Sequence, residues 1–345
     1  MQAVILERFG GPENLKSADL PKPAPAAGEA LVRVRACALN HLDIFVRDGI
    51  PAYKIPLPHI LGCDVAGEVA EIGAGVTSVK TGDRVAVSPG RSCGRCEFCF
   101  SGQDNQCRDY GIIGAQGGPG GYAEFLRVPE GYLLPLPETL SFEEGAAYPL
   151  TFLTVWHMLL TLGRCGPDST VLVLGAGSGV GVAAIQVAKL AGAFVIASST
   201  SEEKLGKARA LGADAGIHSP PQDLTKSVRK LTHGAMADIA VEHVGPAVFD
   251  AALKSLKVGG RLVTCGSTTG PVVELDMRYV FSRQLQILGC KMGTQSEMRQ
   301  VARMVAAGRL KPVVDRVFPL SEARQAHEYL AQKKQFGKVV LKVGA

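Results

Sequence analysis

A short apolar strand, a glycine-rich turn and a small-residue helix follow one another directly and constrain the fold of this chain most. The strand covers residues 171–174, the turn reads Gly175-Ala-Gly177-Ser-Gly179-Val-Gly181, and residues 183–191 have helical spacing. Further apolar runs of the same kind lie at 194–197, 237–244, 261–265 and 285–290, with helical segments between them. Alternating strands and helices predict an α/β fold, a doubly wound parallel sheet with right-handed crossovers.

The glycine turn predicts a phosphate-binding site. Glycines let backbone N–H groups approach a pyrophosphate at the positive end of the following helix. The strict G-x-G-x-x-G spacing is not met, because the sixth position counted from Gly175 is Val180. The order of strand, turn and helix still predicts a dinucleotide site, with an unliganded tight turn as the alternative. The predicted contacts in this turn are Gly175, Gly177, Ser178, Gly179 and Val180.

The end of the second strand, about twenty residues further on, predicts the kind of dinucleotide. An acidic residue there would bond the ribose 2′-hydroxyl and repel a 2′-phosphate. Ser198, Ser199 and Thr200 occupy this place, and Lys204 follows one turn later. Hydroxyls and a cation favour a phosphate dianion, so we predict NADP(H), with NAD(H) as the alternative. The acidic pair at 202–203 is explained equally well by the start of a helix.

Four cysteines lie close together in the sequence and predict a metal site. They are separated by two, two and seven residues. Four thiolates match the tetrahedral preference of zinc and leave no position open for a substrate. Two disulfides or unrelated thiols are the alternatives, but the chain shows no export signal, which favours metal. We therefore predict one structural zinc, held by Cys93, Cys96, Cys99 and Cys107.

The two ends of the chain have a different pattern of predicted elements from the region around the glycine turn. The first 150 residues contain strands broken by turns, and the last fifty return to that mixed character. Ser141 and Glu144 form a capping box at the start of a helix that the apolar pattern extends to residue 162. We expect a nucleotide-binding domain inserted into another domain, with boundaries 1–150, 151–292 and 293–345.

Charge and hydropathy exclude other classes of partner. The net charge of +5 comes from 37 basic and 32 acidic residues that are dispersed along the chain, which argues against a nucleic-acid partner. No run of about 18 apolar residues occurs that could span a membrane. The start of the chain has no basic leader, so we expect a cytoplasmic protein.

Taken together, these motifs resemble the medium-chain dehydrogenase/reductase superfamily over essentially the whole chain. The resemblance rests on residues 62–68, 82–85, 93–107, 175–181 and 337–340. It implies a GroES-like, mostly β catalytic domain beside a Rossmann domain, and a homodimer formed through the strand at 285–290. It also implies cofactor contacts from Gly266, Ser267, Met292 and Lys338, with an exposed surface lysine as the alternative for Lys338.

The zinc alcohol dehydrogenase branch of this superfamily has a second, catalytic zinc, and here the chain departs from the pattern. Asn40 stands in place of the first cysteine ligand, Cys63 in place of the histidine ligand, and Leu150 in place of the last cysteine. Leucine cannot coordinate zinc and a neutral amide binds it poorly, so we expect no catalytic zinc. Substitute ligands in an unusual geometry are the alternative: Cys63 with Asp64, His41, His59 or Cys37.

Asn40, Asp43 and Arg47 resemble instead the quinone and enoyl reductase branch, which works without metal. We therefore expect an NADPH-dependent oxidoreductase that acts on a small α,β-unsaturated carbonyl compound or quinone. The Asn40 amide would stabilise the developing enolate oxygen, and Tyr53 or solvent would supply the proton. A zinc-dependent alcohol dehydrogenase with an atypical metal site and a non-catalytic dinucleotide-binding protein are the alternative functions.

The predicted catalytic residues are Asn40, Asp43, Tyr53, Cys63 and Asp64. Each of the first four also has a purely structural explanation. Asn40 would cap a helix at 42–46, and Asp43 would pair with Arg47 one turn later. Tyr53 would anchor a proline-rich loop, and Cys63 would be a small buried hydrophobic residue.

Overall fold

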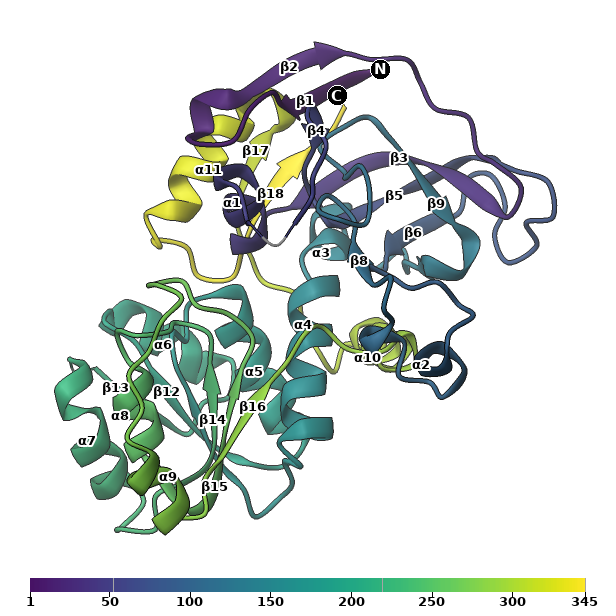
Figure 1. Ribbon diagram of the computed structural model, residues 1–345. Helices are drawn as coiled ribbons and strands as arrows, with labels where there is room; N and C mark the ends of the chain where they lie inside the picture. The colour runs from purple at the N-terminus through teal and green to yellow at the C-terminus, as the bar shows by residue number, and fades with distance from the viewer. Residues whose placement is uncertain (52, 219, 345) are drawn as a thin grey trace. The chain divides into compact units, whose positions relative to one another are not determined.

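The chain passes from one structural unit into a second and then returns (Figure 1). The computed structural model describes residues 1–51, 53–218 and 220–344. Unit 1 comprises Met1–Leu150, Thr294–Gly308 and Pro312–Ala345, and unit 2 comprises Thr151–Gly293 and Arg309–Lys311. The sequence placed the two main boundaries after residues 150 and 292.

Unit 1 is built mainly from strands with short helices between them. Its strands are β1 (Gln2–Leu6), β2 (Leu15–Asp19), β3 (Glu29–Ala38), β4 (His59–Ile60), β5 (Asp64–Ile72), β6 (Arg84–Val87), β7 (Gly90–Arg91), β8 (Gly111–Ile112), β9 (Phe125–Pro129), β10 (Leu133–Pro135), β17 (Val314–Pro319) and β18 (Lys338–Lys342). Its helices are α1 (His41–Asp48), α2 (Glu97–Phe100), α3 (Phe142–Ala146), α10 (Gln295–Ala306) and α11 (Ala323–Ala331).

Strand β3 is the centre of the larger sheet of unit 1. Among the described residues this sheet has seven strands, in the order β10-β6-β5-β3-β18-β17, and β9 also pairs with β3. The side chains of β3 alternate between the two faces, because Val32 and Val34 are buried and Arg33 between them is exposed.

The register of β3 with its two neighbours positions the candidate site. Strands β5 and β18 both run antiparallel to β3 and lie on either side of it. Ala38 at the end of β3 is opposite Asp64 in β5 and Val340 in β18. In an antiparallel pair, the first residues of one strand lie beside the last residues of the other. The first residues of β5 and β18, Asp64 and Lys338, are therefore brought beside the residues that follow β3.

Unit 2 contains the predicted parallel sheet. Its strands are β11 (Thr170–Val173), β12 (Phe194–Ser198), β13 (Ala215–Ile217), β14 (Ala237–Glu242), β15 (Leu256–Thr264) and β16 (Gln286–Gly289). Its helices are α4 (Pro149–Trp156, which begins at the end of unit 1), α5 (Gly179–Leu190), α6 (Glu202–Ala210), α7 (Leu224–Leu231), α8 (Phe249–Lys254) and α9 (Met277–Ser282). The described strands pair in parallel in the order β13-β12-β11-β14-β15-β16, so the direction of winding reverses between β11 and β14.

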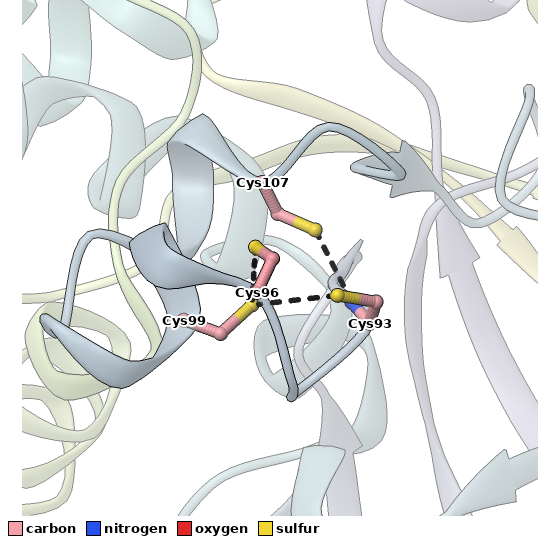
Figure 2. A group of neighbouring side chains, drawn as sticks. All are labelled: Cys93, Cys96, Cys99 and Cys107. Atoms are coloured by element: carbon pink, nitrogen blue, oxygen red, sulfur yellow. Dashed lines mark hydrogen bonds between the residues drawn. The ribbon is translucent and has the colours of Figure 1, made fainter.

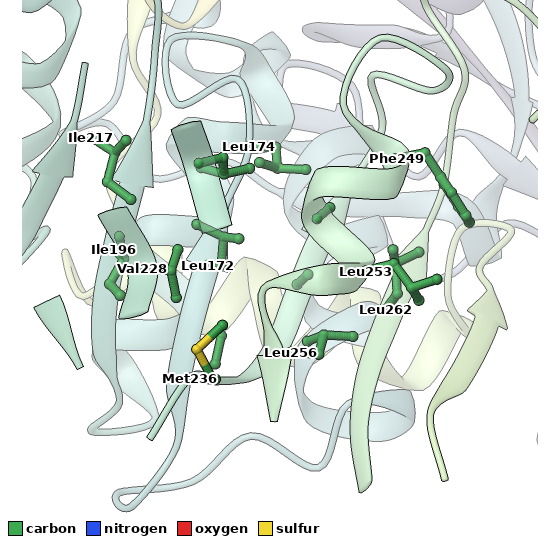
Figure 3. Packing of buried hydrophobic residues seen from close by; sticks show 14 of the residues in the cluster. Leu172, Leu174, Ile196, Ile217, Val228, Met236, Phe249, Leu253, Leu256 and Leu262 are labelled. Atoms are coloured by element: carbon green, nitrogen blue, oxygen red, sulfur yellow. The ribbon is translucent and has the colours of Figure 1, made fainter. Parts of the chain in front are cut away.

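One face of this sheet is covered by α7 and α8. Figure 3 shows Leu172 and Ile196 from the strands packed with Val228 of α7 and with Phe249 and Leu253 of α8. All five side chains are buried. Burying an aliphatic or aromatic side chain of this size contributes about 2 kcal/mol relative to leaving it in water. The same core includes Ala240 of β14 and thus packs β11 and β14 against these helices.

One local prediction about a helix needs correction. The Ser141 capping box is confirmed, since Ser141 Oγ accepts from the Glu144 N–H at 3.1 Å, but the helix does not run to residue 162 unbroken. Helix α3 ends at Ala146, α4 starts at Pro149, and a π-helical segment covers His157–Leu162. Proline has no N–H to continue a helix but is well suited to begin one.

Helix α6, which follows β12, is capped by Ser201. Ser201 Oγ accepts from the Lys204 N–H at 3.3 Å. None of the helices in the described ranges is both long enough and apolar enough to cross a membrane.

Candidate functional site

A buried group of polar side chains lies at the strand ends of unit 1. Asn40 follows β3, while Asp64 begins β5 and Lys338 begins β18. The side chains of Lys338 and Asp64 are 5% and 0% exposed, and Lys338 Nζ lies 2.9 Å from Asp64 Oδ2. A buried charge is tolerated when it is paired and hydrogen-bonded. The ion pair meets the first of these two requirements, and hydrogen bonds with Asn40 meet the second.

Lys338 determines how the Asn40 amide is oriented. The ammonium donates to Asn40 Oδ1 at 2.6 Å. An ammonium can only donate, so the amide atom facing it must be the oxygen. The Nδ2 group then points the other way and donates to Asp64 Oδ2 at 2.9 Å and to Cys63 Sγ at 3.3 Å. Asn40 is the N-cap residue of α1, but these side-chain hydrogen bonds give it a second role.

Asp43 is held by backbone N–H groups. Its Oδ2 accepts from Asn40 at 2.7 Å and its Oδ1 accepts from Gly62 at 3.0 Å. Burial nevertheless raises the pKa of this carboxyl to about 7, with the two N–H donors and Lys338 acting in the opposite direction. The predicted pair with Arg47 is not made, because Arg47 binds Asp48 instead, with Nη2 to Oδ1 at 2.7 Å.

The three positions at which zinc would be held in the alcohol dehydrogenase branch do not fit a metal here. Asn40 and Cys63 are hydrogen-bonded to each other, and the Asn40 oxygen faces the Lys338 ammonium. Burial, followed by the charges of Asp64 and Asp43, raises the pKa of Cys63, which keeps it a neutral thiol. The aliphatic side chain of Leu150 has no metal-ligating atom, and its backbone N–H donates to Asp64 Oδ1 at 2.8 Å.

The remaining predicted residues of unit 1 have clear positions. The surface-lysine alternative for Lys338 is wrong because the residue is 4% exposed, whereas its contact with a pyrophosphate stays a prediction. Tyr53 is half-buried in the turn after α1, and its role as a proton donor stays a prediction.

The four cysteines of the predicted zinc lobe converge on one point (Figure 2). Their sulfur atoms all lie within 4.8 Å of one another, with 3.5 Å between Cys96 and Cys99 and 3.9 Å between Cys93 and Cys99. Zinc–sulfur bonds of about 2.3 Å in a tetrahedron place the sulfurs about 3.8 Å apart, and a disulfide needs about 2.05 Å. The donor set therefore fits a closed zinc site. The backbone N–H of Cys99 lowers the pKa of Cys96 to about 6, which favours the thiolate.

The glycine turn of unit 2 forms a cradle at the start of α5. Ser178 is the N-cap residue, and its Oγ accepts from the Gly181 N–H at 2.9 Å. Position 181 must be a glycine, since a Cβ there would lie 2.4 Å from the Gly175 carbonyl oxygen. The turn thus packs closely on the helix that follows, as a phosphate-binding turn requires. Gly177, Gly179 and Val180 belong to the same turn and helix start.

The predicted nucleotide-selecting residues lie beside this cradle. Ala176 donates its N–H to the carbonyl oxygen of Ser198 at 3.0 Å, which joins the turn to the end of β12. The side chain of Lys204 lies over Gly177, where a Cβ would approach Lys204 Cδ to 2.6 Å. Ser199 and Thr200 connect β12 to α6. Ser198 and Lys204 thus lie beside the turn, whereas selection of the nucleotide by these residues stays a prediction.

The other predicted cofactor contacts in unit 2 lie in loops. Gly266 and Ser267 follow β15, and the Ser267 hydroxyl donates to the Gly270 carbonyl oxygen. Met292 is buried and has a positive φ of 57°. Its Sδ accepts from Thr154 Oγ1 at 3.6 Å. Contact of Gly266, Ser267 and Met292 with a cofactor stays a prediction.

Comparison with known proteins identifies the family. Residues 26–138 match the alcohol dehydrogenase GroES-like domain, and residues 179–307 match the zinc-binding dehydrogenase domain. An alcohol dehydrogenase from Geobacillus stearothermophilus is 34% identical over 347 residues, which cover 99% of this chain and 100% of that protein. The chain belongs to the medium-chain dehydrogenase/reductase superfamily.

Two further comparisons place this medium-chain dehydrogenase/reductase among its relatives. A quinone oxidoreductase from Rattus norvegicus is 32% identical, and the match covers 99% of this chain and 97% of that protein. A crystal structure described as an NAD-dependent alcohol dehydrogenase is 48% identical, with 100% of both chains covered and a TM-score of 0.97. The chain is accordingly an oxidoreductase with a GroES-like and a Rossmann domain.

Sequence reasoning missed two polar residues at the end of β14. Glu242 is 1% exposed, and its Oε1 accepts from the N–H groups of Val244 and Gly245, both at 2.6 Å. His243 is 7% exposed and contacts the glycine turn. The sequence did contain a signal for these residues. An acidic residue and a histidine directly after an apolar strand are unusual unless their side chains have hydrogen-bond partners.

Proposed function

We propose that this protein is an NADPH-dependent reductase that delivers hydride to an α,β-unsaturated carbonyl compound or a quinone without a catalytic zinc. The observation that carries the proposal is the Lys338 ammonium between Asn40 Oδ1 and Asp64 Oδ2. It places a fixed cation and an oriented amide where the alcohol dehydrogenase branch uses metal ligands. The likeness to a quinone oxidoreductase supports the same conclusion.

A conjugated substrate suits such a site. When bound, NADPH supplies a hydride that the substrate accepts at its β-carbon, so negative charge develops on the enolate oxygen. Asn40 Nδ2 has one strong acceptor, Asp64, and one weak acceptor, the Cys63 sulfur. The N–H directed at the sulfur is therefore the one available to the enolate oxygen. Donation from Lys338 to Asn40 Oδ1 polarises the amide and strengthens its N–H as a donor.

The choice of NADPH rests on charges near the end of β12. Glu202 is paired with Arg209 at 2.9 Å and Glu203 with Lys207 at 2.7 Å, so the nearby acids are matched by cations of their own helix. Lys204 lies against Gly177 and carries a cation to the same edge of the cradle. NADH remains the alternative, because the 48% identical structure is described as NAD-dependent.

Turnover and metal content test the proposal together. Purified protein should oxidise NADPH with an enone or a quinone, should leave simple aldehydes nearly untouched, and should contain one zinc per chain. Two zinc ions per chain with oxidation of plain alcohols would establish the metal-dependent alternative. Cofactor binding without turnover of any substrate would establish the non-catalytic one.

The Asn40→Ala variant tests the proposed donor. Loss of such a donor should lower kcat tenfold or more, which corresponds to at least about 1.4 kcal/mol. The variant should keep the Kd for NADPH, which shows that unit 2 is intact. Enone reduction within about twofold of the wild type would remove Asn40 from the mechanism.

We also propose that two copies pair through β16. This strand lies at one edge of the described sheet and leaves backbone groups unpaired there. Ile287 on the strand and Phe281 on the preceding helix are 37% and 69% exposed. Light scattering should give a dimer for the wild type and a monomer for Ile287→Lys, with Ile72→Lys as the control. The cytoplasmic location and the lack of a nucleic-acid partner stay predictions.

A further inference from the structure

His243 lies where the winding of the unit 2 sheet reverses. It directly follows β14, whose neighbour on one side is β11, the strand that leads into the glycine turn. In open α/β sheets, ligands bind outside the carboxyl ends of the strands at such a reversal. A buried imidazole at this point therefore faces the loops that would hold a ligand.

The His243 ring is hydrogen-bonded to both ends of the glycine turn. Its Nε2 lies 3.0 Å from the Leu174 carbonyl oxygen and 3.1 Å from Ser178 Oγ. A carbonyl oxygen can only accept, so Nε2 must carry a hydrogen. The ring also lies against Gly175, where a Cβ would be 3.0 Å from His243 Cε1 and where φ is +58°. Glycine at 175 thus makes room for the imidazole.

The contact between His243 and Ser178 determines the direction in which the Ser178 hydroxyl donates its hydrogen. Its oxygen has two lone pairs. One accepts from the Gly181 N–H at 2.9 Å, and the other accepts from His243 Nε2–H, which is shared with Leu174. With both lone pairs occupied, the hydroxyl hydrogen must be donated away from these partners. A phosphate oxygen at the start of α5 is an acceptor of the required chemistry.

We propose that His243 is a positioning residue for the dinucleotide: it fixes the backbone at residues 174–175 and orients the Ser178 hydroxyl as a donor to the pyrophosphate. The backbone of His243 reaches a further loop, because its carbonyl oxygen accepts from the Thr268 N–H at 3.4 Å. The inference rests on the proposed binding of a nicotinamide dinucleotide and holds for NADPH and NADH alike, because both carry the pyrophosphate.

Direct binding measurements test this role. His243→Ala should raise the Kd and KM for both NADPH and NADH about tenfold, the effect of one lost hydrogen bond to a charged group. The kcat at saturating cofactor should stay within about twofold. His243→Gln keeps an N–H donor and should recover most of the affinity. His233→Asn, at an exposed histidine of the same unit, is the control and should bind as the wild type does.

A double variant separates positioning from a merely structural effect. Because His243 acts through Ser178, Ser178→Ala should cost about as much as His243→Ala, and combining them should add little. Additive losses, or a lower Tm with an unchanged Kd, would overturn the proposal. A wild-type protein that binds neither NADPH nor NADH would instead overturn the proposed function, whatever the variants do.

Discussion

Lys338 Nζ lies 2.6 Å from Asn40 Oδ1, although 298 positions separate the two residues in the chain. The contact is buried, and it fixes which atom of the amide faces the cation. Asp64, which pairs with Lys338 at 2.9 Å, neutralises the charge. The chemistry proposed for unit 1 depends on this arrangement, and it can be tested by stability as well as by turnover.

Replacing Lys338 by methionine should destabilise unit 1 by about 3 kcal/mol, because the Asp64 carboxylate is left buried without its cation. Urea unfolding of the wild type and the variant measures the difference. Lys342→Met, on the exposed end of the same strand, is the matched control and should change stability by less than about 0.5 kcal/mol. Equal effects of the two variants would show that the buried pair has no special role.

Asp43 should make stability fall as pH rises from about 4 to about 7. Its carboxyl has a pKa of about 7 in the folded protein and an ordinary value near 3.8 when unfolded. In this window only the folded state keeps the proton, so deprotonation of the unfolded chain favours unfolding. The stability difference between the wild type and Asp43→Asn should shrink across the window and be constant above about pH 8. A difference that is constant from pH 4 to 9 would contradict the assignment.

His327 should have the opposite pH dependence. Burial, with a smaller contribution from Arg47, lowers the pKa of this imidazole to about 3, so it stays neutral when folded. As pH falls from about 6.5 towards 3, the unfolded chain gains a proton that the folded chain does not, and stability is lost. His327→Gln should reduce this acid loss, as urea titrations between pH 7 and pH 4 would reveal. Tyr122, which lies 3.0 Å from His327 Nε2, can still bond the glutamine amide.

Removing zinc should loosen the start of α10 as well as the cysteine lobe. Asp104 of the lobe accepts from the Gln295 N–H at 3.2 Å, and Gln295 Nε2 donates to Ser88 Oγ and to the Gly90 carbonyl oxygen, both at 2.9 Å. Chelation, or Cys99→Ser, should lower Tm by about 5 °C or more and speed hydrogen exchange at residues 294–297. Unchanged exchange there in the zinc-free protein would contradict this coupling.

Lys204 should select the nucleotide. Lys204→Ala should raise the KM for NADPH about tenfold, because a phosphate loses a cation, and should leave the KM for NADH within about twofold. Lys207→Ala removes a cation one turn away that pairs with Glu203, and it provides the control. Equal losses with both cofactors would mean that Lys204 serves the shared pyrophosphate instead.

Local patterns were predicted well because their physics is local. The Ser141 capping box involves residues three positions apart, and it is present. The strand, glycine turn and helix at 170–190 also form as predicted. The helix predicted to reach residue 162 was too long, because apolar spacing alone did not register the break at Pro149. The pair expected between Asp43 and Arg47 failed because each found other partners in the folded chain.

The class of fold, the thiolate lobe and the glycine-turn cradle could be predicted from the sequence, since each depends on residue types at short spacing. Which buried polar groups pair with one another depends instead on how the chain folds in three dimensions. Asn40, Asp64 and Lys338 meet because β5 and β18 begin beside the end of β3, and His243 meets Ser178 because β14 lies next to β11. A buried charge or amide must find a partner, and strand register, which no short segment encodes, determines which partner is within reach.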